Sequence, residues 1–345
     1  MDRRRVGWAI CLALLYWTAG CKHPVQIVTN NRVTMDTPSL RAMQRLAVIP
    51  VTRGAPGVDR QIALIDVDGL LVNQPMTGLL SDGENPVALF REKLDRVASS
   101  GCYAGLVLRI NSPGGGVTAS DVMWHDLQEF KARTHLPVIA CLMDVGAGGA
   151  YYLSTAADHV VAHPTTVTGG IGVILNLYNL EDAMGQFNVV GTPIKAGENV
   201  DLGTPIKPQS EEARAILQRM ANEFHERFRK IVIERRPQLA HASPDLFDGR
   251  VFTAQQALTA GLVDTIGYLD QAAEMAGQMG GAPGAALVLL HRPNDGARTP
   301  YDVTANVPIQ SSFLPISMPG LERARLPTFL YLWQPEPTME RLTGR

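Results

Sequence analysis

The stretch from Asp144 to Val173, DVGAGGAYYLSTAADHVVAHPTTVTGGIGV, decides the fold of this 345-residue chain. It contains a Gly-rich loop, a run with the composition of a short helix and a second Gly-rich turn. A strand that ends in a tight glycine turn and opens a helix is how several α/β folds present a nucleophile. Gly148 stands where that nucleophile would be, and a glycine has no group that attacks a carbonyl or transfers a proton. The stretch therefore predicts an active-site scaffold without its reactive side chain.

Strand and helix patterns alternate on both sides of this stretch. Short apolar runs at 62–67, 106–110 and 136–140 are separated by helical spacing at 86–99 and 120–132. Crossover connections of this length predict an α/β fold, a mostly parallel sheet with helices on its faces. Further along the chain we expect strands at 172–176, 189–194, 262–264 and 287–290, the last at an edge of the sheet, and helices at 210–236, from 253 and from 268.

The N-terminus has the features of an export signal. Three arginines, Arg3–Arg5, precede an apolar run at 6–17 that is short for a membrane span. The sequence TAGC that follows resembles a bacterial lipobox, with Thr18 where leucine is usual. We therefore expect 1–21 to be a signal peptide and Cys21 to carry a lipid, which makes the chain an exported lipoprotein on the periplasmic side of a membrane. An ordinary cleaved signal and an uncleaved anchor remain open alternatives.

Composition divides the rest of the chain into three parts. Residues 22–58 are polar and irregular and indicate a linker, 59–280 carry the strand and helix patterns, and 281–345 form a Pro/Gly-rich C-terminal extension. An apolar patch in this extension, 329–333, could dock on the folded body, on a partner or on the lipid surface. A net charge of −2 and the lack of a basic stripe argue against binding to nucleic acid. No spacing of Cys and His predicts a metal site, and we expect no cofactor.

Four glycine-containing motifs lie in the predicted domain. The first, NSPGGG at 111–116, directly follows a strand, at the end where parallel sheets bind ligands. Its glycines Gly114 and Gly115 allow backbone N–H groups to face a ligand, as in an oxyanion hole. A phosphate-binding loop is excluded because no Lys-Ser/Thr pair follows, whereas a plain turn remains open. The other motifs are GAGGA at 146–150, TGGIGV at 168–173 and IKAGENVD at 194–201.

Together with DGRV at 248–251 and GLVD at 261–264, these motifs resemble the SppA-type signal peptide peptidase family of serine proteases, from about Gln61 to Gly277. The resemblance implies the ClpP/crotonase fold, with repeated ββα-type units, and identifies 59–280 as a peptidase-like domain. It also implies ring-like homo-oligomers. Members of the family cut residual signal peptides and other membrane-associated peptides with a serine nucleophile and a lysine base.

The resemblance places the reactive groups of the family on residues that cannot perform this chemistry. The nucleophile falls on Gly148 (AASGGYY in the family, GAGGAYY here), the orienting serine on Gly170 and the lysine base on Val200. A serine attacks only when a base removes its proton, and a lysine does so only when burial keeps it neutral. No catalytic residue is therefore intact. The two glycines of the first motif, together with Gly149, remain as candidates for an oxyanion or peptide-binding site.

Other polar residues near these motifs are candidates to replace the lost groups. They are Ser154, Thr155, Thr168, Lys195, Asp144, Asp201, His159 and His163. We expect the first six to be solvated or capping groups. The two histidines have no matching partner in the pattern, and we expect them to be structural.

Three functions remain open. The best supported is a catalytically inactive family member that binds extended peptides or membrane-associated protein segments. It would act as a homo-oligomer or in mixed oligomers with active relatives, at a membrane reached through the lipid anchor. The alternatives are an active serine-type endopeptidase with relocated catalytic groups and a crotonase-like acyl-CoA enzyme. Export to a compartment poor in CoA argues against the last.

Overall fold

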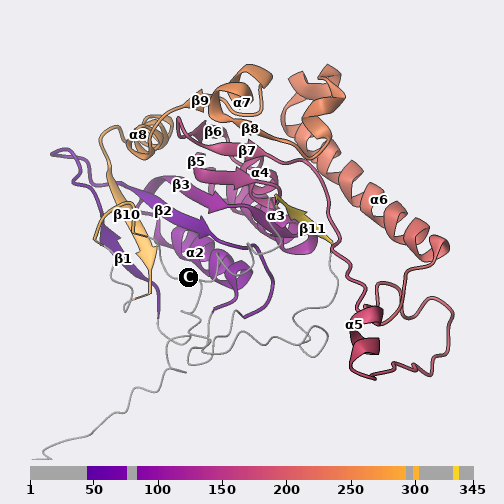
Figure 1. Ribbon diagram of the computed structural model, residues 1–345. Coiled ribbons are helices and arrows are strands. Elements are labelled where there is room, and N and C mark those ends of the chain that lie inside the picture. Colours follow the sequence, from indigo (N-terminus) through magenta and orange to yellow (C-terminus); the bar gives the residue numbers. More distant parts are fainter. Residues whose placement is uncertain (1–44, 76–83, 293–297, 303–328, 334–345) are drawn as a thin grey trace, which may run out of the picture. The chain divides into compact units, whose positions relative to one another are not determined.

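The computed structural model describes residues 45–75, 84–292, 298–302 and 329–333, all within one compact unit, Pro38–Arg345. Its centre is a nine-stranded sheet (Figure 1). Four neighbouring strands run parallel in the middle: β2 (Gln61–Asp68), β3 (Tyr103–Ser112), β5 (Val138–Ala147) and β6 (His159–Ala162). The prediction of a mostly parallel sheet is confirmed.

The outer strands extend this sheet on both sides. β10 (Ala286–His291) lies parallel to β2, and β1 (Ala47–Pro50) pairs antiparallel with β10. β9 (Thr265–Ile266) follows β6, whereas β7 (Val167–Gly169) pairs with β5 and β8 (Val251–Thr253) pairs antiparallel with β7. Two expectations change here. Part of the expected linker forms β1, and β10 is not an edge strand, because β1 satisfies its outer hydrogen-bonding groups.

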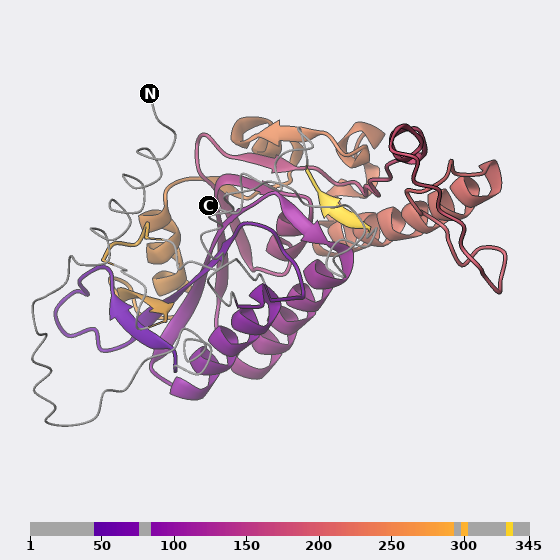
Figure 2. The ribbon, with the colours of Figure 1, turned by 60° about the horizontal axis from the view of Figure 1, so that its bottom comes forward.

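Helices cover both faces of the sheet, which explains why the central strands are apolar without alternation. α2 (Pro86–Ser100) and α3 (Val117–Thr134) lie side by side on one face (Figures 1 and 2). α8 (Leu269–Met279) covers the other face. Leu106 packs in the core beneath α2 and α3, and its neighbour Val107 packs with α8. Successive residues of a strand therefore enter two separate apolar cores.

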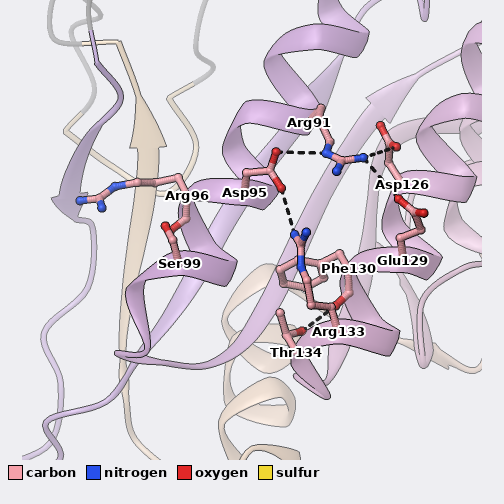
Figure 3. Close-up of polar contacts among 9 residues, drawn as sticks. All are labelled: Arg91, Asp95, Arg96, Ser99, Asp126, Glu129, Phe130, Arg133 and Thr134. Atoms are coloured by element: carbon pink, nitrogen blue, oxygen red, sulfur yellow. Dashed lines mark hydrogen bonds and ion pairs between the residues drawn. The ribbon is translucent and has the colours of Figure 1, made fainter.

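Ion pairs join the exposed sides of α2 and α3 (Figure 3). The guanidinium of Arg91 pairs with Asp126 at 2.8 Å and with Asp95 at 3.1 Å, and Arg133 reaches Asp95 at 2.9 Å. Each exposed pair contributes only about 0–1 kcal/mol. The two helices are therefore held mainly by their buried apolar faces.

The remaining helices follow the sequence closely. α6 (Glu211–Arg235) begins at Ser210, whose side chain accepts a hydrogen bond from the Ala213 amide, so the helix predicted at 210–236 is confirmed. The shorter helices are α4 (Gly149–Ser154), α5 (Glu181–Gln186) and α7 (Ala254–Ala260). Among the described residues, no helix is long and apolar enough to cross a membrane. The predicted signal peptide and Cys21 lie outside those residues.

Three expected strands are wrong in place or in kind. Residues 189–194 form an exposed loop, because their apolar composition has no neighbouring strand to pair with. At 172–176 only Ile174 forms a bridge, with Leu330. The strand expected at 262–264 is shifted to β9, Thr265–Ile266.

Candidate functional site

Five glycines meet beside the carboxyl ends of β3 and β5: Gly114, Gly115, Gly148, Gly149 and Gly170. A Cβ atom on Gly114 would lie 2.6 Å from the amide nitrogen of Gly149. One on Gly149 would lie 3.4 Å from the nitrogen of Gly115, and one on Gly170 would lie 3.2 Å from the nitrogen of Gly148. We call these five residues the glycine cradle. The structure thus brings together the three candidate binding glycines and the two positions, Gly148 and Gly170, to which the sequence pattern assigns the nucleophile and the orienting serine.

Gly148 keeps the backbone turn of an active site. It joins β5 to α4 with φ 55° and ψ −125°, a conformation that residues with a side chain rarely adopt. In hydrolases that use a strand-to-helix turn, the same kind of strained turn exposes the nucleophile. Such strain costs about 1–3 kcal/mol for a residue other than glycine. The geometry of a nucleophile turn is present here, and the nucleophile is absent.

A strand from the C-terminal extension lies in the groove beside the cradle. β11 (Leu330–Leu332) pairs antiparallel with β4 (Gly114–Gly116), with Tyr331 opposite Gly115 (Figure 1). On its other side, Leu330 exchanges two backbone hydrogen bonds of 2.9 Å with Ile174. The segment 329–333, which we call the tail strand, is therefore held between β4 and Ile174. The sequence left three docking places open for this segment, and the structure shows that it docks on the folded body.

The hydrogen bonds of the tail strand fix its register. The Val117 amide donates to the Phe329 carbonyl at 3.2 Å, and the Trp333 amide donates to the Pro113 carbonyl at 3.0 Å. Hydrogen-bonded pairs recur at every second residue of an antiparallel ladder, so Tyr331 and Gly115 form the pair between these two.

This register sets a peptide bond of the tail strand over Gly148. A Cβ atom at Gly148 would collide with the carbonyl oxygen of Tyr331 and lie 2.8 Å from its carbonyl carbon. It would also lie 3.1 Å from the amide nitrogen of Leu332. The Tyr331–Leu332 peptide bond occupies the place where the side chain of a nucleophile would begin.

The Tyr331 side chain fills an aromatic pocket. Its ring is fully buried, stacks on Tyr152 with the centroids 5.4 Å apart, and lies 4.7 Å from the ring of Phe228. Its hydroxyl donates to the Phe224 carbonyl at 2.7 Å. The Phe329 ring packs against that of Phe224 at 5.1 Å. Aromatic contacts of this geometry add about 0.5–1.5 kcal/mol each to the burial of apolar area.

The polar ends of this pocket are satisfied. The Tyr152 hydroxyl donates to Asp121, which also pairs with Arg227 at 2.7 Å. Burial raises the pKa of Tyr152, and the hydrogen bond to Asp121 raises it further. Burial also raises the pKa of Tyr331. Both phenols are therefore neutral hydrogen-bond donors near neutral pH.

A cavity of about 370 Å³ continues the groove beyond the tail strand. Its walls come from the segment after the second Gly-rich turn, from α6 and from the tail strand itself. Its lining includes Gly170, Ile174, His225, Asp248 and Trp333. The imidazole Nε2 of His225 lies 3.1 Å from the Ile171 carbonyl. The groove therefore has room for more residues than the tail strand supplies.

Val200, the position to which the sequence pattern assigns the lysine base, is not part of the cradle. It is 68% exposed and lies in a loop, residues 188–200, in which every residue is exposed. Figures 1 and 2 show this loop, next to α5, apart from β11. At its base Asp201 pairs with Lys195 at 2.9 Å and with Lys207 at 2.6 Å, and these bonds lower the pKa of Asp201 to about 2.

The other candidate residues have structural partners. The hydroxyls of Ser154, Thr155 and Thr168 donate to the backbone carbonyls of Tyr151, Tyr152 and Gly146. His159 bonds to Thr265 and His163 to Thr165, while Asp144 is exposed. Within the described ranges, no lysine or histidine nitrogen is hydrogen-bonded to a hydroxyl at the cradle. In the same ranges, no group of three or more His, Cys, Asp or Glu is arranged to hold a metal ion.

One hydroxyl beside the cradle was missed from the sequence. Ser120 is fully buried in the first turns of α3, and its hydroxyl donates to the Gly116 carbonyl at 2.9 Å. A Cβ atom on Gly149 would collide with this hydroxyl oxygen. The only signal in the sequence is a small residue one helical turn after the first Gly-rich motif, which by itself indicates close packing.

The model of peptidase family S49 matches residues 131–281, a range that includes Gly148, Gly170 and Val200. A putative protease of Synechocystis is 31% identical over 206 residues, which are 60% of this chain and 73% of the relative. The chain belongs to peptidase family S49. A putative signal peptide peptidase SppA of Enterococcus faecium is 28% identical over 214 residues, and a putative protease of Methanocaldococcus jannaschii is 31% identical over 195 residues. These matches cover 62% and 56% of this chain, respectively, and 62% of the length of each of these two relatives.

Proposed function

We propose that this S49 family member binds extended polypeptide segments, in the groove between β4 and Ile174, without hydrolysing them. One observation carries the proposal. The groove already holds an extended segment by backbone hydrogen bonds on both sides, and the peptide bond at its centre faces a residue without a side chain. Binding through the main chain requires little of the ligand sequence, as in other cases of strand addition.

The chemistry of the site supports binding over cleavage. Backbone donors of the cradle can hold a carbonyl oxygen, but peptide hydrolysis also needs an attacking group and a base to activate it. Gly148 offers no hydroxyl, and the nearby Thr168 hydroxyl is committed to the Gly146 carbonyl at 2.7 Å. Val200 has neither an amine nor a buried position. The backbone donors that can hold a carbonyl oxygen are therefore present, whereas an attacking hydroxyl and a base to activate it are not.

The cellular part of the proposal rests on the sequence. A signal peptide that ends at Cys21 would place the groove at a membrane surface on the exported side. The ligands would then be membrane-associated protein segments. Homo-oligomers, or mixed oligomers with active relatives, would set such segments beside other grooves of the family.

A binding assay followed by product analysis tests this proposal. The full chain is incubated with a fluorescent library of unstructured peptides, binding is followed by anisotropy, and the peptides are then recovered for mass spectrometry. We expect saturable binding and peptides of unchanged mass. Products that vanish in a Ser120→Ala variant would instead reveal a relocated nucleophile. A failure of every peptide to bind would overturn the binding function itself.

A further inference from the structure

We propose that Asn111 is a positioning residue of the groove, because its side chain holds a bulge in β5 that sets the Gly148 turn beside Gly114. Peptide affinity therefore depends on a side chain that lies outside the glycine cradle. The inference rests on the proposed function for this affinity alone, since the position of Gly148 can be followed without a ligand. Asn111 is the first residue of the motif NSPGGG, of which only glycines belong to the cradle.

The ladder between β3 and β5 is irregular immediately before the cradle. Ile110 of β3 pairs with Leu142 of β5, and the next pair joins Ser112 to Gly146. One residue of β3, Asn111, therefore faces three residues of β5. A regular ladder would have one residue on each strand at this point, so β5 carries two extra residues and forms a bulge.

The bulge lies where β5 changes its neighbour. As far as Leu142 it pairs with β6, and from Val145 it pairs with β7. The Gly148 amide then donates to the Gly169 carbonyl at 2.9 Å. Without the two extra residues, Gly148 would lie roughly 6–7 Å further along the strand direction, away from its place beside Gly114. The assembly of the cradle therefore depends on the bulge.

The Asn111 side chain holds the bulge through both ends of its amide. The Val145 amide donates to Oδ1 of Asn111 at 3.2 Å, in place of the backbone acceptor that a regular ladder supplies. At the other end, Nδ2 of Asn111 donates at 3.1 Å to Oδ1 of Asp68, the last residue of β2. A carboxylate only accepts hydrogen bonds, so Asp68 fixes which end of the Asn111 amide faces Val145.

Thr166 holds the opposite side of the bulge. Its side chain is buried, and its hydroxyl donates to the carbonyls of Leu142 and Met143. Backbone groups of the bulge are therefore bonded to side chains on both sides, from Asn111 on β3 and from Thr166 just before β7. Bulges beside functional sites commonly direct the residues that follow them, and here those residues form the cradle.

The side chains of Asn111 and Asp68 can be exchanged without changing the net charge. Asn111→Asp alone sets a second carboxylate against Asp68. Burial already raises the pKa of Asp68, and the nearby charges of Asp66 and Asp144 act in the same direction, so a further carboxylate is unfavourable here. Adding Asp68→Asn restores both hydrogen bonds: the new amide donates to the carboxylate at position 111, which still accepts from the Val145 amide.

Two measurements on the full chain at neutral pH test this role. Peptide affinity is measured by anisotropy with the fluorescent peptide library, and protection of the Gly148 amide is measured by hydrogen exchange. We expect Asn111→Asp to weaken peptide affinity about tenfold and to make the Gly148 amide exchange about tenfold faster. The double variant, Asn111→Asp with Asp68→Asn, should return both quantities to within about threefold of their native values.

Arg60→Met separates a positioning role from a purely stabilising one. Arg60 donates to the carbonyls of Tyr103 and Gly280 at the amino end of β3, whereas Asn111 lies near its carboxyl end. The loss of these bonds should lower the stability of the chain. We expect it to leave peptide affinity and the exchange of the Gly148 amide within about twofold of their native values, because the bulge keeps its contacts.

The outcomes distinguish this inference from the proposed function. Unchanged exchange of the Gly148 amide in Asn111→Asp, or a double variant no better than the single one, would overturn the positioning role. Equal losses of affinity in Asn111→Asp and Arg60→Met would also overturn it, since both would then follow from stability. If no chain binds a peptide, the proposed function fails, and exchange at Gly148 still decides the role of Asn111. Circular dichroism establishes that the variants are folded, and Thr166→Val replaces Asn111→Asp if the latter is not.

Discussion

The sequence pattern assigns the nucleophile to the glycine cradle and the lysine base to the loop at 188–200, and these two regions differ in burial and in backbone structure. The cradle is buried, three of its glycines have positive φ angles, and Gly115 pairs with the tail strand. Every residue of the loop is exposed. The cradle pairs with the tail strand through its backbone, whereas the loop is exposed to solvent. A strand can therefore be held through its main chain without a contribution from the loop.

Removing a buried charge below the groove should give the largest effect. Lys93 pairs with Asp66 at 2.7 Å, and both side chains are 1% exposed. Asp66 lies in β2, which leads to Leu71, and Leu71 bonds to Gly114 and Gly116 of the ladder. We expect Lys93→Met to lower the free energy of unfolding by about 3–5 kcal/mol, because it leaves a carboxylate without this buried cation.

Urea unfolding measures that change. The control is Lys230→Met, because Lys230 reaches Glu234 at 3.8 Å on the surface of α6. We expect the control to shift stability by less than about 0.5 kcal/mol. Similar small shifts for both variants would mean that the cradle does not depend on the buried pair.

Restoring a hydroxyl at Gly148 tests the separation of the two regions. Gly148→Ser should lower stability by about 1–3 kcal/mol through backbone strain, and it should expel the tail strand. It should not create hydrolysis, because the exposed loop supplies no base. The matched control is Gly185→Ser, since a Cβ atom at Gly185 has nothing within 4 Å. Cleavage of a peptide by Gly148→Ser would show that a base does reach the cradle.

A substitution at Tyr152, which lies against Tyr331 in the aromatic pocket, should have a smaller effect on stability. Tyr152→Phe removes the hydrogen bond to Asp121 but keeps the ring on which Tyr331 stacks. We expect a loss of about 0.5–1.5 kcal/mol of stability and little change in peptide affinity. Thermal unfolding measures the stability and the anisotropy assay measures the peptide affinity. The control is Tyr178→Phe, at an exposed tyrosine. A large loss of affinity with unchanged stability would place the Tyr152 hydroxyl in ligand binding.

Charges at the base of the loop should have the smallest effect. Lys207 and Lys195 hold the pKa of Asp201 at about 2, below its ordinary value of 3.8. A carboxyl group with a lowered pKa stabilises the fold above its ordinary pKa, and this contribution is lost as the pH falls through about 2. Because solvent screens these ion pairs, Asp201→Asn should lower stability at neutral pH only slightly. Titration by NMR should show the Asp201 pKa moving toward its ordinary value in Lys207→Met, and no movement would contradict the assigned cause.

The sequence predicts the parts of the molecule that depend on local pattern. Apolar runs such as Leu106–Ile110 identify strands buried on both faces, and Ser210 identifies the start of α6. The glycine turns identify the cradle, because few other residues adopt such a backbone. At 189–194, however, the composition of a strand is present without any partner to pair with. A strand exists only with a neighbour, and the sequence alone does not show where that neighbour lies.

Pairing between distant residues also explains why the sequence does not show where the segment 329–333 docks. Leu330 and Ile174 each look like ordinary apolar residues, and their mutual hydrogen bonds use only backbone atoms. The composition of the patch at 329–333 indicates a docking element, but the sequence does not show where it docks. Ser120 was missed because a single serine in a helix carries no mark of the Gly149 backbone packed against it.

The state of the Tyr331–Leu332 peptide bond tests the central claim most directly, because this bond lies over Gly148 in the folded chain. The purified full-length protein is incubated for days, and its intact mass is followed by mass spectrometry. The account predicts a mass that does not change. A truncated chain ending at Tyr331, together with a fragment beginning at Leu332, would show that the cradle cleaves what it binds.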